Sequence, residues 1–191
     1  VVKKARSADM PDFDYKWDAT ETNIVAVDDS QEQSSRALLH SIAVIGLDNF
    51  GSAQADVLVS EGYETIGDVL SIKPDKLIDL VGVARAKNIR ANLRKKVDEA
   101  DLVTLMMASN AFGIGFGKRR FQALLTAYPD IATMNPRAVK DLDPPHGFSQ
   151  STMDLFADGV VAFRAFARNL KVSKERMSFK APKRKKGSLS G

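Results

Sequence analysis

Apolar residues in the middle of the chain recur three or four positions apart, which is the spacing of amphipathic helices. The spacing is clearest in Ile89-Leu93-Val97 and in Phe121-Leu124-Leu125. It predicts helices over six stretches, residues 34–44, 53–60, 75–80, 86–97, 119–127 and 151–161. Residues 23–27, Asn-Ile-Val-Ala-Val, are compatible with a short strand or an extended arm. The pattern therefore predicts an all-α body that follows an extended N-terminal arm.

A short pattern repeats four times along this body. Each copy is a small residue, an apolar residue and a second small residue, and the first small residues lie 33, 33 and 32 positions apart. The four copies are Asn49-Phe50-Gly51, Gly82-Val83-Ala84, Gly115-Phe116-Gly117 and Gly147-Phe148-Ser149. A fixed period of this length predicts tandem supersecondary units that bury a shared core.

The triplet has a physical reason at each position. The first small residue can adopt a positive φ, so the chain can reverse sharply between two helices. The apolar residue can turn inward and hold the two helices together. The second small residue leaves the amide groups at the start of the next helix open, and with the helix dipole they suit an anion such as phosphate. Alternatively, the glycines are plain helix C-caps, although that explanation does not account for the repeated triplet.

The pattern resembles the helix-hairpin-helix motif of sequence-nonspecific DNA binding. The resemblance implies DNA contacts by the small turn residues, which are Asn49, Gly51, Gly82, Ala84, Gly115, Gly117, Gly147 and Ser149. Cations follow the second turn, namely Arg85, Lys87 and Arg90, and the third, namely Lys118, Arg119 and Arg120; all but Arg90 are counted as predicted DNA contacts. A cation at a helix N-terminus opposes the dipole, and a bound phosphate would remove that conflict. Arg94 to Lys96 are better explained as ordinary charges at a helix end.

The first and fourth turns have no cations close by. They offer Ser52, Gln54, Ser149, Gln150 and Ser151 instead. Neutral donors can bind phosphate, but a purely structural role for these two turns is equally open.

Composition excludes several classes of protein and divides the chain into three zones. The 191 residues carry a net charge of +4, made of −4 over residues 1–35, zero over 36–167 and +8 over 168–191. The basic end is typical of a solvated linker, and less often of an auxiliary nucleic-acid contact. No apolar run is long enough to span a membrane. Since there is no cysteine, and the two histidines, His40 and His146, lie far apart, no metal site and no cysteine nucleophile is predicted.

Four tandem hairpins, most specifically over residues 37–162, resemble the helix-hairpin-helix domain of NAD⁺-dependent DNA ligases. Residues 37–63 resemble the first hairpin of that family and residues 105–128 the third. Residues 1–11 resemble the segment that leaves the oligonucleotide-binding (OB) barrel, and residues 187–191 the lead into a BRCT domain. The expected organisation is an extended arm over 1–33, a four-repeat DNA-binding domain over 34–168 and a basic flexible linker over 169–191.

Two departures from that family matter. Its four-cysteine zinc finger is missing, and residues 15–29 stand in its place as a metal-free arm, which suggests a divergent or viral ligase. The adenylation machinery is not in this chain either. The resemblance therefore implies a non-catalytic segment of an enzyme.

The resemblance also implies how the segment works. It would bind nicked double-stranded DNA through the minor groove and both phosphate backbones, with two pairs of hairpins, for nick sealing in replication and repair. The adenylation and OB domains would be partners in the same chain or in a separate subunit. NAD⁺ and Mg²⁺ belong to the complete ligase, and no cofactor is expected on this segment. The expected location is cytoplasmic, on a bacterial nucleoid or in a virus-infected cell.

Two other functions remain open. One is a helix-hairpin-helix module of another repair or recombination protein, such as a junction binder or a nuclease partner. The other is an all-α protein-interaction domain with decayed hairpins. Salt-dependent binding to duplex DNA of any sequence is expected for the first and absent for the second.

Overall fold

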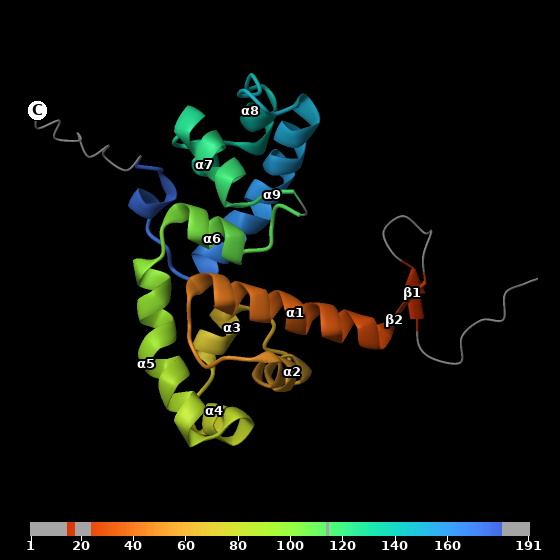
Figure 1. The fold of residues 1–191 in the computed structure, drawn as a ribbon, viewed down its shortest axis with the longest axis vertical. Coiled ribbons are helices and arrows are strands. Elements are labelled where there is room, and N and C mark those ends of the chain that lie inside the picture. Colours follow the sequence, from red (N-terminus) through yellow and green to blue (C-terminus); the bar gives the residue numbers. More distant parts are fainter. Residues whose placement is uncertain (1–14, 18–23, 114, 181–191) are drawn as a thin grey trace, which may run out of the picture.

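The computed structural model describes residues 15–17, 24–113 and 115–180, and within them the body is all-helical (Figure 1). Strands β1 (Tyr15–Trp17) and β2 (Ile24–Ala26) pair antiparallel ahead of the body. The N-terminal half comprises α1 (Val27–Ile45), α2 (Ser52–Ser60), α3 (Ile66–Ser71), α4 (Pro74–Val81) and α5 (Val83–Glu99). The C-terminal half comprises α6 (Leu102–Ala108), α7 (Lys118–Ala127), η1 (Ile131–Thr133), α8 (Pro136–Lys140), α9 (Gln150–Asn169) and η2 (Lys174–Met177).

The start of the body differs from the predicted boundary at residue 34. Helix α1 begins at Val27, directly after β2, so residues 27–33 are helical and do not belong to an extended arm. Arg36 pairs with Glu32, one helical turn earlier, and this ion pair supports helical structure before the predicted start at residue 34. Of the two possibilities left open for residues 23–27, a short strand or an extended arm, the structure has the short strand, β2. Residues 1–14 and 18–23 of the predicted arm lie outside the described residues.

The predicted flexible linker is wrong for residues 169–180, which fold back onto the body. Met177 is buried, and the Phe179 N–H donates to the Pro129 carbonyl at 2.9 Å. The Arg176 guanidinium donates to the carbonyls of Val97 and Ala100, both at 2.7 Å. Apolar residues spaced among the cations, such as the buried Met177, make this packing possible, whereas the charge pattern alone is typical of a linker. Residues 181–191, with the remaining predicted linker, lie outside the described residues.

An aromatic cluster fills the core of the C-terminal half. The Phe112 ring lies 4.8 Å from that of Phe156 and 5.1 Å from that of Phe121, between ring centroids. Gly159, in the middle of α9, leaves the room for this arrangement, because a Cβ there would lie 2.5 Å from Phe112 Cδ1. Stacked and edge-on rings add to the apolar area that they bury. The cluster therefore holds α9 against the segment that leads into α7.

The two halves are joined by packing of α1 on α6 and by hydrogen bonds across the junction (Figure 1). The Ser41 hydroxyl donates to the Ala108 carbonyl at 2.6 Å. The Asn110 amide donates to Ser41 Oγ at 2.8 Å and to the Ala37 carbonyl at 3.1 Å, and its Oδ1 lies 2.9 Å from His40 Nδ1. At the other side, Arg94 Nη1 donates to the Leu170 carbonyl at 2.8 Å. These bonds fix the relative placement of the turns in the two halves.

Candidate nucleic-acid interface

The four predicted turns lie where the triplets occur, between the helix pairs α1/α2, α4/α5, α6/α7 and α8/α9, here called hairpins 1 to 4. The first small residue has a positive φ in all four, 59° at Asn49, 83° at Gly82, 107° at Gly115 and 84° at Gly147. Left-handed backbone of this kind favours glycine and tolerates asparagine, which are the residues present. The predicted turn conformation is confirmed at each of these positions.

The second small residue begins the next helix in three of the hairpins. Gly51, Gly117 and Ser149 are N-cap residues with extended φ values of −124°, −109° and −108°. Hairpin 2 differs, because Gly82 both ends α4 and caps α5, so that Ala84 already lies within the first turn of α5. The α4–α5 connection is thus a single residue.

The apolar residue of the triplet turns inward in three hairpins only. Phe50, Phe116 and Phe148 are half-buried and pack against the core. Val83 is 68% exposed, so the prediction of an inward apolar residue is wrong for hairpin 2. The reason is the short connection: Val83 is the first residue of α5 and lies on the outer side of that helix.

Helices α5 and α7 begin without a side-chain cap. Their first hydrogen bonds run from the Ala86 N–H to the Gly82 carbonyl at 2.9 Å and from the Phe121 N–H to the Gly117 carbonyl at 3.1 Å. The three amide groups that precede each of these donors have no acceptor among the described residues. Both N-termini therefore present open donors together with the positive end of a helix dipole.

Hairpins 1 and 4 satisfy part of their polar groups internally. The Gly51 N–H donates to Gln54 Oε1 at 2.8 Å, and Ser149 Oγ accepts from the Thr152 N–H at 3.3 Å. Beside hairpin 4, Lys140 Nζ lies 2.8 Å from Asp158 Oδ1, and this hydrogen bond raises the pKa of Lys140. Of the four hairpins, 2 and 3 are thus the better equipped to hold an anion.

The predicted cations of hairpins 2 and 3 are exposed. Across residues 30–113 and 115–180, none of Arg85, Lys87, Lys118, Arg119 and Arg120 lies within 4 Å of a carboxylate. Arg120 has a further role, because its guanidinium lies 5.8 Å from the centre of the Phe148 ring and so links hairpin 3 to hairpin 4. Arg94 and Lys95, in contrast, pair with Asp98 and Glu99 one turn later, as expected of charges at a helix end.

Arg85 and Lys87 do not form one cluster. Residues two apart on a helix point about 200° apart, so these cations lie on opposite flanks of α5. Arg85 shares its flank with Asn88, whose amide donates to the Asp48 carbonyl of hairpin 1 at 2.7 Å. Lys87 shares its flank with Arg90, which was not among the predicted DNA contacts although it is three residues away on the same face.

The described residues contain no group of three metal-ligating side chains close enough to hold an ion. Nor does any described helix have the length and apolar composition needed to cross a membrane.

Replacement of Gly82 by alanine is expected to lower the free energy of unfolding by about 1–3 kcal/mol, because a φ of 83° with a ψ of 159° is a region that is essentially restricted to glycine. No atom lies within 4 Å of the added Cβ, so the loss would come from the backbone alone. Gly117→Ala is the matched control, since Gly117 has an extended φ and equally open space. Urea unfolding of both variants measures the difference, and equal midpoints would contradict the expectation.

Paired helices with open N-termini, flanked by cations that have no carboxylate within 4 Å among the described residues, define a helical domain suited to binding a polyanion. The chain is 30% identical over 175 residues to a DNA ligase of Acanthamoeba polyphaga mimivirus, a match that covers 87% of this chain and 28% of that ligase. This similarity shows a relationship to a DNA ligase, of which the chain corresponds to a part. No protein-family model matches the sequence, and no solved structure matches it either.

Proposed function

We propose that the chain is the DNA-binding region of an NAD⁺-dependent DNA ligase and that hairpins 1 to 4 are tandem helix-hairpin-helix repeats. The observation that supports this best is the pair of helix N-termini at α5 and α7 that lack a side-chain cap, each with cations that have no acidic partner in the described part of the chain. The relationship to a DNA ligase makes DNA the natural polyanion.

Phosphate binding follows from the chemistry of these two N-termini. Open amide donors, the helix dipole and the side chains of Arg85, Lys118 and Arg119 all favour a negative charge at the same place. Such contacts reach the backbone of DNA and carry no base information. We therefore assign hairpins 2 and 3 to the phosphate backbone on either side of a nick, in the minor groove.

Hairpins 1 and 4 would support the other two. Within the described residues, each leaves two open amides at the start of its second helix instead of three, because the Gln54 and Thr152 N–H groups already donate to Gly51 and Ser149. Phe148 of hairpin 4 also lies 5.8 Å from the guanidinium of Arg120 of hairpin 3. In this proposal each half of the body contributes one pair of hairpins, 1 with 2 and 3 with 4. Hairpins 2 and 3 are the principal DNA-binding members of their pairs. The small residues Asn49, Gly51, Gly147 and Ser149 then serve mainly to shape their turns.

Within the complete ligase, this region would hold the nicked duplex while other domains perform the chemistry. The adenylation and OB domains would act as its partners, and NAD⁺ and Mg²⁺ would serve the complete ligase and would not bind to this region. The region would supply affinity and orientation for nick sealing in replication and repair inside the cell.

The proposed function predicts salt-dependent binding to nicked duplex DNA with little preference for base sequence. Fluorescence anisotropy with labelled nicked duplexes of two unrelated sequences, titrated between 50 and 200 mM salt, measures it. We expect equal affinity for both sequences and a linear fall of log K with log salt. Absence of binding at 50 mM salt would overturn the proposal and favour a protein-interaction domain. Tighter binding to a four-way junction than to a nicked duplex would favour another repair protein.

A further inference from the structure

One flank of α5 carries a row of four residues that starts at hairpin 2, of which the first three are exposed and the last, Arg94, is half-buried. Val83, Lys87, Arg90 and Arg94 are spaced at i, i+4, i+7 and i+11, which places them on one face of the helix. The buried residues Ala86, Ile89, Leu93 and Val97 form a separate stripe toward the core. The row extends over about 16 Å, since a helix rises about 1.5 Å per residue.

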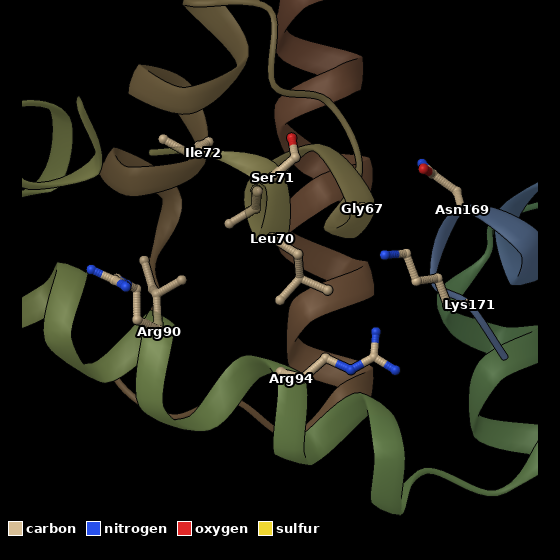
Figure 2. A pocket seen from close by; sticks show the side chains of 10 residues that line it. Gly67, Leu70, Ser71, Ile72, Arg90, Arg94, Asn169 and Lys171 are labelled. Atoms are coloured by element: carbon tan, nitrogen blue, oxygen red, sulfur yellow. The ribbon is translucent and has the colours of Figure 1, made fainter. Parts of the chain in front are cut away.

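Two adjoining depressions follow this row and share Arg90. The first, of about 420 Å³, lies between α4 and α5, with Ile78, Val83 and Lys87 in its wall. The second, of about 500 Å³, lies between α3, α5 and the end of α9 (Figure 2). Leu70 lies in the middle of the second depression, with Arg90 on one side and Arg94 and Lys171 on the other, as Figure 2 shows. We call the two depressions together the α5 groove.

The free charges of the α5 groove are all positive. In the described part of the chain, no carboxylate lies within 4 Å of Lys87, Arg90 or Lys171. Arg94 is already paired with Asp98, and it donates to the carbonyl of Leu170, the residue before Lys171. Arg94 thus serves to position the chain that carries Lys171, and the remaining cations have no carboxylate partner among the residues that the structure describes.

We propose that the α5 groove is an additional binding site for the DNA backbone, so that a strand held at hairpin 2 continues past Arg90 to Lys171. This inference rests on the proposed function and extends it beyond the hairpin turns. The 16 Å row corresponds to the rise of roughly five nucleotides of one strand. Cations along its length suit successive phosphates, and the apolar surface of Val83, Ile78 and Leu70 between them suits the sugars.

The test is the double variant Arg90→Gln with Lys171→Gln, assayed for nicked-duplex binding across a salt series. Loss of two phosphate contacts is expected to make the slope of log K against log salt less steep by about 2, with affinity roughly tenfold weaker at low salt. Lys171 has a positive φ of 56°, and glutamine bears the same backbone strain there as lysine. The replacement therefore does not change the conformational cost at this position. Circular dichroism and thermal unfolding establish that the fold is retained.

The matched control is Lys95→Gln with Lys96→Gln, which also removes two positive charges, in this case from two positions of α5 outside the row. We expect the control to keep the slope of the unaltered chain. An unchanged slope in the Arg90/Lys171 variant, while the unaltered chain binds, would overturn the α5 groove and leave the proposed function standing. An equal loss in the control would also overturn it, because net charge alone would explain the effect. If the unaltered chain itself fails to bind, the proposed function and this inference fail together.

Discussion

Replacement of Lys118 and Arg119 by glutamine is expected to weaken nicked-duplex binding by about a hundredfold at low salt. Each side chain is exposed at the uncapped N-terminus of α7 and lacks an acidic partner in the described structure. A hydrogen bond to a charged group is worth about 1.5–3 kcal/mol, and two such losses at an exposed site account for the expected factor. The salt slope should fall by about 2 at the same time.

The same variant should be no less stable than the unaltered chain. Cations in the first turn of a helix oppose its dipole, so their removal is expected to raise the free energy of unfolding by about 0.3–1 kcal/mol for each. Anisotropy titration and urea unfolding, carried out on one preparation, measure the two effects. Opposite changes in binding and stability would identify Lys118 and Arg119 as binding residues, whereas a parallel loss of both would assign them a structural role.

Arg120 is kept in this variant for a structural reason. Its guanidinium stacks on Phe148, so Arg120→Ala would also disturb the contact between hairpins 3 and 4. The triple replacement should weaken binding further, but part of that loss would come from the contact with Phe148. Lys95→Gln with Lys96→Gln again serves as the control for net charge.

Phe112→Ala is expected to lower the free energy of unfolding by about 3–5 kcal/mol. Phe112 is 6% exposed, and its ring centroid lies within 6.0 Å of those of Phe116, Phe121, Phe156 and Phe163. Removal of the ring would leave a cavity that the surrounding aromatic side chains cannot readily fill. The loss is a large fraction of the 5–15 kcal/mol that is typical of a whole domain.

Urea unfolding followed by circular dichroism measures this loss. Leu155→Ala is the control, because Leu155 is 59% exposed on α9 and should cost no more than about 0.5 kcal/mol. A similar loss of unfolding free energy in both variants would mean that the Phe112 ring contributes little to the stability of the aromatic cluster.

The helical pairs and their turns could be predicted from the sequence because both depend on local physics. Apolar spacing indicates a helix, and the reversal at Asn49, Gly82, Gly115 and Gly147 needs a residue that accepts a positive φ. The outward direction of Val83 could not be predicted in the same way. It depends on a one-residue connection, and the boundary of a helix is set by contacts that the triplet does not encode.

The packing of residues 169–180 shows a second limit. Arg176 is bonded to carbonyls nearly eighty positions earlier, and charge composition alone carries no information about such a partner. For the candidate site, the opposite flanks of Arg85 and Lys87 follow from helical geometry and were predictable. The hydrogen bonds of the Gly51 N–H and of Ser149 Oγ could not be predicted from the sequence, because they depend on the conformations of nearby side chains.

The bonds that join the two halves have an evolutionary consequence. The acceptors at Ala37, Val97, Ala100, Ala108 and Leu170 are main-chain carbonyls, which every residue type supplies. Sequence drift at those acceptor positions therefore leaves the bonding groups in place, as long as the replacement fits. The donors are specific side chains, those of Ser41, Arg94, Asn110 and Arg176. In a diverging lineage, inheritance of the inter-half geometry would thus be concentrated in these four side chains and in His40, whose ring pairs with Asn110 Oδ1. The positions that supply only a carbonyl are free to vary.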